Sequence, residues 1–187
     1  MRRCCAAVIC ALIVVGCAAP LKQFYPGTYF PEDRTYQNKS IGFSLTYRGS
    51  WELITDPNRM KENKKYAQEC QQSGLELLFV GFTAEKMQGT RCIVGNLNET
   101  GTEWADNVRR INTTHVDKDF GTTQDTLHGV SMVRWEYAKN EIRFVEFFFS
   151  VDTYNIRVAF WTTPDLYDKF LPVYKDIMKT LSITDRE

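Results

Sequence analysis

The segment that most restricts the fold is residues 143–151, RFVEFFFSV, which as a strand would be apolar on both faces. Because successive side chains of a strand point to opposite faces, a strand of this composition must be covered on both faces, or lie centrally between long neighbours that shield one face. Alternating patterns on either side predict neighbouring strands at about 127–138 and 154–162. With a strand at about 141–151 between them, they predict a three-stranded antiparallel meander.

A two-residue turn at Lys139–Asn140 is expected to connect the first two strands of this meander. It would place Glu136 opposite Arg143, and a cross-strand pair of opposite charges stabilises a sheet. This pair therefore predicts the register of the meander.

Further strand and helix patterns fill the rest of the chain. Phe43, Leu45 and Tyr47 alternate with polar residues, as in a half-buried strand. Asp56–Pro57 and Thr163–Pro164 resemble helix starts, because these side chains can cap free N–H groups and proline is tolerated at the first helical position. We expect strands at 75–83 and 90–98 and a polar stretch at 112–124. We expect helices at 56–72 and from 163 to about 181. A further helix should begin at Thr102, with Trp104, Val108 and Ile111 on one face. The pattern predicts one α+β domain, a single predominantly antiparallel sheet packed against helices.

The N-terminus has the form of a secretory signal. Arg2 and Arg3 precede an apolar core of about ten residues, whereas a helix that crosses a bilayer needs about 20. Residues 14–17, VVGC, resemble the bacterial lipobox, after which a peptidase cleaves before the cysteine. The resemblance predicts that residues 1–16 are removed and that Cys17 carries the lipid.

Lipid at Cys17 would hold the protein at a membrane, because two or more acyl chains anchor firmly where one holds marginally. Residues 17–35 would then be the lipidated N-terminus and tether, with three prolines. Ala18 after the cysteine resembles the signal for outer-membrane sorting, so we expect the periplasmic face of the outer membrane. The alternative is an ordinary signal cleaved after the cysteine, which would leave a secreted protein without an anchor.

The balance of charge restricts the partners. The chain has 23 basic and 23 acidic residues and no basic block, which argues against nucleic acid as a partner. Removal of the signal leaves about 170 residues, enough for one core without disulfide staples. We therefore expect a membrane contact through the lipid and a protein partner in the cell envelope.

Two of the six cysteines, Cys70 and Cys92, would remain in the folded part after processing and lipidation. An oxidising compartment favours a disulfide between them, which would close a loop of about 22 residues and stabilise by roughly 3 kcal/mol. If the strands between them pair as a hairpin, however, Cys92 lies roughly 20 Å along the strand from the end near Cys70. A bridge needs Cα atoms within about 7 Å, so two buried free thiols are the favoured alternative.

The segments IGFSLTYRGSW near the start and RFVEFFFSVDTYNIRVAFWTTPDLYDKFLPVYKDIMKTLSI at the end resemble the PsbP-like superfamily. The resemblance covers residues 36–183, and Arg48 stands where the family most often has proline. It implies an αβα sandwich around an antiparallel sheet. It also implies a non-enzymatic role, typically the binding and stabilisation of a larger assembly, and carries no binding residue across to this chain.

No arrangement of residues predicts catalysis. Only His115 and His128 could serve a hydrolase triad, no G-x-S-x-G elbow occurs, and no cofactor motif is present. His115, Asp117 and Asp119 lie close enough in sequence to hold a cation in a loop, although one short run supplies at most three ligands and a solvated turn is the favoured alternative. A ligand pocket could be lined by Trp104, Trp135, Trp161 and residues 147–149, but a sheet packed on helices needs the same residues for its core.

These patterns predict a lipid-anchored accessory or binding module of the cell envelope that stabilises a membrane-associated complex without catalysis. An envelope protein that binds a small ligand or a divalent cation is the alternative, and a hydrolase is the third choice.

Overall fold

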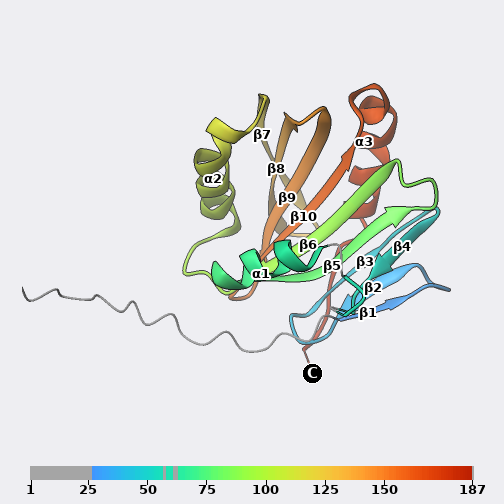
Figure 1. Cartoon of the computed structure of the whole chain (residues 1–187). Helices are drawn as coiled ribbons and strands as arrows, with labels where there is room; N and C mark the ends of the chain where they lie inside the picture. The colour runs from blue at the N-terminus through green and yellow to red at the C-terminus, as the bar shows by residue number, and fades with distance from the viewer. Residues whose placement is uncertain (1–26, 57, 61–62, 187) are drawn as a thin grey trace, which may run out of the picture.

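Two antiparallel sheets and three α-helices make up the part of the chain that the structure describes (Figure 1). The computed structural model describes residues 27–56, 58–60 and 63–186. The predicted signal sequence, Cys17 and the first part of the predicted tether therefore lie outside the described residues. Within these ranges, no helix has the length and apolar character needed to cross a bilayer.

The larger sheet contains the predicted meander. Its seven strands follow the order β4-β5-β6-β10-β9-β8-β7, so that β9 lies between β8 and β10 as expected. In this order the strands are Trp51–Ile54 (β4), Leu75–Thr83 (β5), Gln88–Gly95 (β6), Tyr154–Thr162 (β10), Ile142–Val151 (β9), Val130–Lys139 (β8) and Lys118–Leu127 (β7). The predicted α+β class is confirmed.

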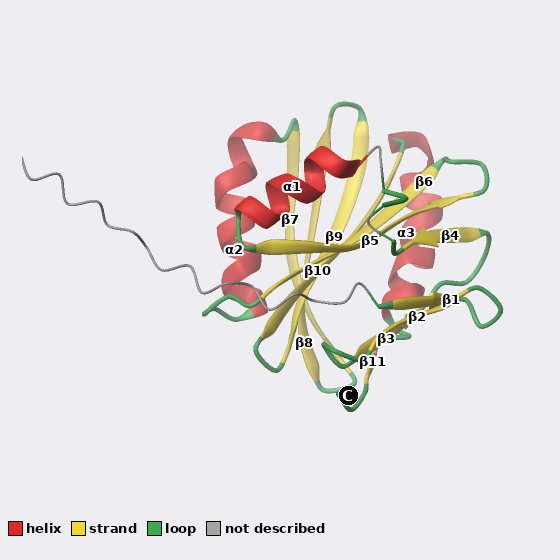
Figure 2. Cartoon of the chain, turned by 60° about the horizontal axis from the view of Figure 1, so that its bottom comes forward, coloured by secondary structure: helices red, strands yellow, loops and turns green. Residues whose placement is uncertain are grey.

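Strand β9 is covered on both faces, as its composition requires. Phe147 and Phe149 belong to a core shared with helix α3 (Pro164–Met178) and the smaller sheet. Phe148 points to the other face and packs edge-on against Trp104 of helix α2 (Gly101–Asn112). Helix α1 (Lys64–Gln72) lies on the same side as α2, so the large sheet is the middle layer of an αβα sandwich (Figure 2).

The smaller sheet departs from the single sheet that the sequence predicted. Its strands are Thr28–Phe30 (β1), Thr35–Asn38 (β2), Phe43–Thr46 (β3) and Ser182–Ile183 (β11), in the order β1-β2-β3-β11. The turn at 48–50 separates β3 from β4, which pairs with β5 in the large sheet. Two sheets form because the residues on either side of this turn pair with different partners.

The folded part also begins earlier than the predicted boundary at residue 36. Tyr29 of β1 packs against the core, and its hydroxyl donates a hydrogen bond to the Trp51 carbonyl at 3.2 Å. Burial of this ring accounts for the order of a segment that we predicted to be part of the tether.

Helix α2 starts at a different cap from the one predicted. Thr100, rather than Thr102, is the N-cap: its hydroxyl accepts from the Glu103 N–H, and the Glu103 carboxylate accepts from the Thr100 N–H at 2.7 Å. This reciprocal pair is a capping box. Ile111, predicted to lie on the buried face, is 62% exposed, because the buried residues of α2 are in its first turns and Ile111 lies in its last turn.

Of the other two predicted helix starts, the one at Asp56 is wrong and the one at Thr163 is confirmed. Asp56 does not begin a helix; its carboxylate accepts from the Asn58 N–H at 2.8 Å in an Asx turn, and α1 begins at Lys64. Thr163 is the N-cap of α3 and Pro164 occupies the first turn, as predicted.

Strand β7 was missed because the stretch 112–124 is polar. Most side chains of β7 are exposed, and the strand is paired on one side with β8. An edge strand of this kind is held by backbone hydrogen bonds and needs no apolar face, so its sequence lacks the usual alternation.

The register of the β8–β9 hairpin is shifted from the prediction. Asn140 and Glu141 have positive φ values of 50° and 61°, so the turn lies one residue later than Lys139–Asn140, and Glu136 faces Val145. The Arg143 guanidinium still lies 3.7 Å from the Glu136 carboxylate. A long arginine reaches its partner diagonally, so the charge pair was right and the register inferred from it was wrong.

Candidate functional site: an arginine–aromatic face of the large sheet

A buried charge lies at the centre of the sheet face that carries α1 and α2. The strand register places Val80, Arg91, Ala159, Glu146 and Trp135 in one row across five neighbouring strands. Ala159 stands between Arg91 and Glu146, and its small side chain leaves room for the arginine to reach across β10. The Glu146 side chain is fully buried, where a charge is stable only if it is paired.

Arg157 provides the main partner of Glu146. Its Nε and Nη2 donate to the two carboxylate oxygens at 2.7 and 2.8 Å, a bidentate geometry, and the Tyr137 hydroxyl donates to Oε1 at 2.9 Å. Burial by itself would raise the pKa of Glu146, but the charge and hydrogen bonds of Arg157, with Arg91 and Tyr137, outweigh it and hold the pKa below its usual value. Glu146 is therefore ionised at neutral pH, and it has no surface through which it could act as a base on a substrate.

Arg91 adds a second positive charge that the carboxylate compensates weakly. Its Nη2 lies 3.5 Å from Glu146 Oε1, farther than the Arg157 contacts, and its Nε has no hydrogen-bond partner. The guanidinium lies 4.6 Å from the ring centre of Tyr66 and 5.7 Å from that of Trp161. Two guanidinium groups thus face one carboxylate, and aromatic rings stabilise the surplus cation.

Arg91 is also the more accessible of the two cations. Its side chain is 21% exposed, compared with 13% for Arg157. Burial raises the pKa of the neighbouring Tyr66 to about 12, so this ring stays neutral at physiological pH. Because Arg91 keeps its charge and reaches the surface, it can pair with an anion from outside the protein.

Aromatic side chains form a second row beside these charges. The register aligns Phe82, Gly89, Trp161, Phe144 and Tyr137 across the same five strands. A side chain at Gly89 would overlap the Trp161 indole, so the glycine makes room for this ring to lie over β6. Phe144 stacks on Tyr137 with ring centres 4.9 Å apart.

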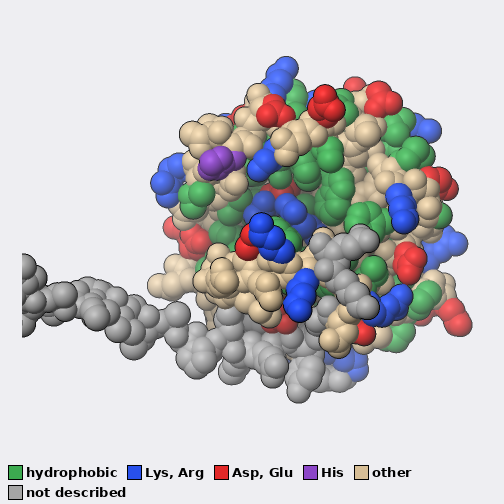
Figure 3. Space-filling model, viewed as in Figure 1, with side chains coloured by type: hydrophobic (Ala, Val, Ile, Leu, Met, Phe, Trp, Pro, Cys, Tyr) green, Lys and Arg blue, Asp and Glu red, His purple; other side chains and the backbone are tan. Residues whose placement is uncertain are grey.

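We name the half-buried residues Tyr66, Phe82, Arg91, Phe144 and Trp161 the arginine–aromatic face. Figure 3 shows basic side chains recessed behind the helix at the front, next to a band of hydrophobic side chains. A hollow of about 590 Å³ adjoins the face at Phe82, and its lining includes Ile54, Met60 and Lys86. The face therefore combines apolar area with a cation, as a docking surface for an acidic and partly apolar segment would.

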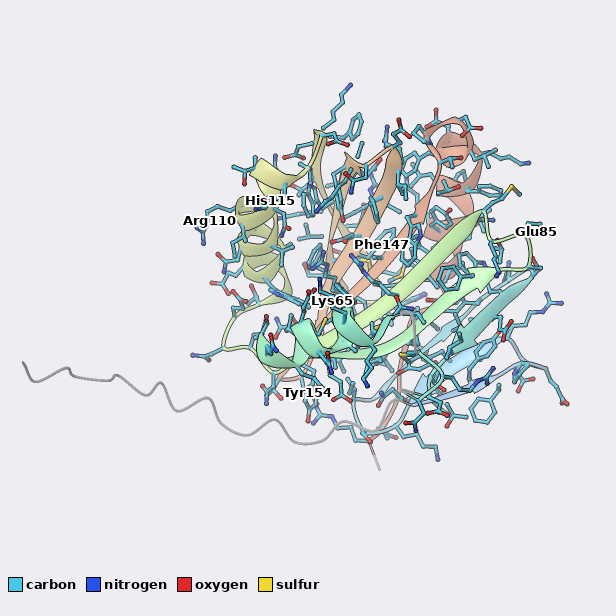
Figure 4. All side chains as sticks on the ribbon, viewed as in Figure 1. Lys65, Glu85, Arg110, His115, Phe147 and Tyr154 are labelled. Carbon is cyan, nitrogen blue, oxygen red and sulfur yellow. The ribbon has the colours of Figure 1, made fainter. Side chains whose placement is uncertain are left out.

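The structure does not bring the predicted cation ligands together. Asp119 accepts hydrogen bonds from Arg109, Gly121 and Trp135, and the Asp117 carboxylate accepts from the Asn140 N–H. His115 is exposed in the short 3₁₀ helix Thr113–His115, which follows the helix that carries Arg110 (Figure 4). Within the described ranges, no three or more His, Cys, Asp or Glu side chains are grouped as metal ligands. The acidic groups fix the start of β7 instead.

Cys70 and Cys92 are both free and buried, so the structure has the two free thiols of the favoured alternative and not the disulfide. Cys70 belongs to the core under α1 and α2, whereas Cys92 belongs to the core on the opposite face of the large sheet. Cys92 pairs with Phe79 of β5. Burial raises the pKa of both thiols, so neither is an activated nucleophile.

The aromatic residues proposed for a pocket are mostly core. Trp104, Trp135 and residues 147–149 are buried, and Trp161 alone of that set is half-exposed. Arg91, Glu146 and Arg157 were not among the residues predicted from the sequence to form a site. A signal was present, because a glutamate inside an apolar strand that is covered on both faces requires a buried cation, but the strand order is needed to identify that cation.

No protein-family model matches the chain. No curated protein sequence matches it either. Among solved structures, the solution structure of cyanobacterial PsbP (CyanoP) from Synechocystis sp. PCC 6803 is similar, with a TM-score of 0.55 and 11% identity over 80% of this chain and 91% of that chain. This similarity supports a PsbP-like fold, as the sequence resemblance implied.

Two further structures align less closely. A protein of unknown function from Pseudomonas aeruginosa, described as a putative regulator, has a TM-score of 0.43 and 13% identity over 50% of this chain and 72% of its own. A protein from Bacteroides thetaiotaomicron has a TM-score of 0.45 and 10% identity over 81% of this chain and 48% of its own.

Proposed function

We propose that this protein is a lipid-anchored, non-catalytic accessory protein of the bacterial cell envelope, which binds and stabilises a membrane-associated complex through the arginine–aromatic face. The observation that carries the proposal is the surplus positive charge of Arg91 on a half-buried aromatic surface. The lipobox-like residues 14–17 support the anchor, and the PsbP-like fold is consistent with a binding role.

The chemistry of the face defines the partner as a protein segment with an acidic side chain next to an aromatic or large aliphatic one. Glu146 is already satisfied by Arg157 and Tyr137, so an incoming carboxylate would find in Arg91 an undercompensated donor. The rings of Phe82, Trp161 and Phe144 offer apolar area beside it. Aromatic and arginine side chains are also the residue types that dominate binding energy at protein interfaces.

Site-specific crosslinking in the native membrane tests this proposal. A photoreactive residue at Phe144 should capture an envelope protein, and the captured segment should contain the expected acidic and apolar residues. The same residue at Arg110, which is exposed on the outer side of α2, is the control and should not capture that protein.

Charge reversal supplies the second test. Arg91→Glu should reduce the Phe144 crosslink at least tenfold, and Arg110→Glu should leave it unchanged. A crosslink that survives Arg91→Glu, or equal capture from both positions, would exclude this face as the docking site.

The anchor is tested separately by mass spectrometry of the natively expressed protein. We expect an N-terminus at Cys17 with a mass increment for lipid, and a location at the periplasmic face of the outer membrane. An unmodified N-terminus beyond residue 17 would disprove the lipid anchor while leaving the binding face untouched.

A further inference from the structure

A hollow on the opposite face of the large sheet lies between the β7–β8 hairpin and α3. Its volume is about 320 Å³, near the lower end of the roughly 300–1,000 Å³ range of ligand pockets. Leu127, Met132, Phe147 and Met178 supply its apolar part. Phe147, labelled in Figure 4, comes from the middle strand β9.

The apolar part of the hollow is adaptable, while its two walls are held together. Methionine side chains are flexible and fit ligands of irregular shape, and Met132 and Met178 both line the space. The hairpin turn is tied to α3 because His128 Nε2 lies 3.1 Å from the Lys179 carbonyl oxygen, within hydrogen-bond distance. The separation of the two walls is therefore fixed in the folded protein.

Basic side chains outnumber acidic ones around the hollow. Arg134 is balanced by Glu136 at 3.1 Å and by Asp125 at 3.9 Å, and Lys179 is balanced by Asp176 at 2.8 Å.

Lys175 is different. Its side chain lines the hollow and is half-buried, and the structure pairs it with no carboxylate among the described residues. An ammonium group beside an apolar surface is a good partner for a ligand that carries a negative charge at one end.

We propose that this hollow binds a small amphipathic carboxylate of the medium-chain fatty acid class. The carboxylate pairs with Lys175, and the hydrocarbon chain lies against Met132, Phe147 and Met178. If each carbon occupies about the 30 Å³ of a water molecule, the hollow takes a chain of about ten carbons. The site is independent of the arginine–aromatic face, because the two lie on opposite sides of the large sheet.

Methionine-methyl NMR of the full chain provides a local readout of binding. Decanoate, below its micelle concentration, should shift the methyl signals of Met132 and Met178. Met60 and Met87 lie outside the hollow and serve as internal controls whose signals should stay in place. Decan-1-ol, which has the chain without the charge, and acetate, which has the charge without the chain, should each bind at least tenfold more weakly than decanoate.

The lysine is tested with a matched pair of variants on α3. Lys175→Gln should weaken decanoate binding at least tenfold, whereas Lys169→Gln, an exposed lysine of the same helix, should not change it. Unchanged methyl spectra of the variants without ligand would show that the fold is intact. The proposal would be overturned if all four methionines shifted equally, if decan-1-ol bound as tightly as decanoate, or if decanoate did not bind. None of these results affects the crosslinking test of the arginine–aromatic face.

Discussion

Replacement of Arg157 by glutamine would leave the Glu146 carboxylate buried without its bidentate partner. In the folded protein this carboxylate is fully inaccessible and receives two hydrogen bonds from Arg157. Glutamine supplies only a neutral NH2 group in place of the charged guanidinium. Arg91, at 3.5 Å, and the Tyr137 hydroxyl, at 2.9 Å, would be the remaining partners.

The expected cost is about 3 kcal/mol in the free energy of unfolding at pH 7. Removing one partner of a buried ion pair costs roughly 3–5 kcal/mol, and the remaining contacts of Glu146 place this case at the lower end. For a domain of this size the melting temperature should fall by roughly 6–12 °C. The double variant Arg157→Gln/Glu146→Gln should recover at least half of the loss, because the buried charge is then gone.

The pH dependence follows from the direction of the Glu146 pKa shift. In the wild type this pKa is lowered from 4.5, so the stabilisation is present above about pH 4.5 and is lost as the pH falls through the lower folded-state value. Without Arg157, burial dominates and raises the pKa of Glu146. The carboxyl group of the variant therefore takes up a proton on acidification, and the stability difference from wild type should narrow between pH 7 and pH 4.

Urea denaturation followed by tryptophan fluorescence measures these differences. Arg110→Gln, which changes an exposed arginine of α2, is the control and should stay within about 0.5 kcal/mol of wild type. A loss below 1 kcal/mol for Arg157→Gln, a double variant no more stable than the single one, or a difference that widens on acidification would refute the assignment of Glu146 as a buried carboxylate neutralised by Arg157.

Other substitutions test the packing and the local structure. Gly89→Ala should destabilise by about 1–3 kcal/mol and shift the tryptophan emission, because the added methyl overlaps the Trp161 indole; an unchanged spectrum would contradict that packing. Thr100→Ala should lower the free energy of unfolding, measured by urea denaturation, by about 1 kcal/mol, because the α2 capping box is lost. Thr100→Ser keeps the hydroxyl and should lower it little. Equal losses of stability in the two variants would rule out the cap. The thiols of Cys70 and Cys92 should not react with a thiol reagent in the native protein and should both react in denaturant. If they reacted in denaturant only after reduction, the two cysteines would form a disulfide and the assignment of free thiols would be wrong.

The candidate site was harder to predict than the fold class. The meander and the start of α3 carried strong local signals, since RFVEFFFSV admits few environments and Thr163–Pro164 can begin a helix. Strand β7 and the start of α2 depended on pairing and capping that weaker patterns left open. Within the charged cluster, Arg157 lies on β10, which directly follows β9 in the chain. Arg91 lies on β6, 55 residues before Glu146, so only the strand order brings it to the cluster.

The sequence by itself determined that both faces of β9 must be shielded, either by covering layers or by long neighbouring strands, because periodicity and composition are local properties of the chain. It could not determine that Arg91 also reaches Glu146, because that depends on the order β6-β10-β9 and on the small side chain of Ala159 between them. Only the tertiary structure placed two arginines around one carboxylate, so that the positive charge of Arg91 is not fully compensated. A charge is compensated by whatever lies near it in space, and nearness in space is set by strand pairing.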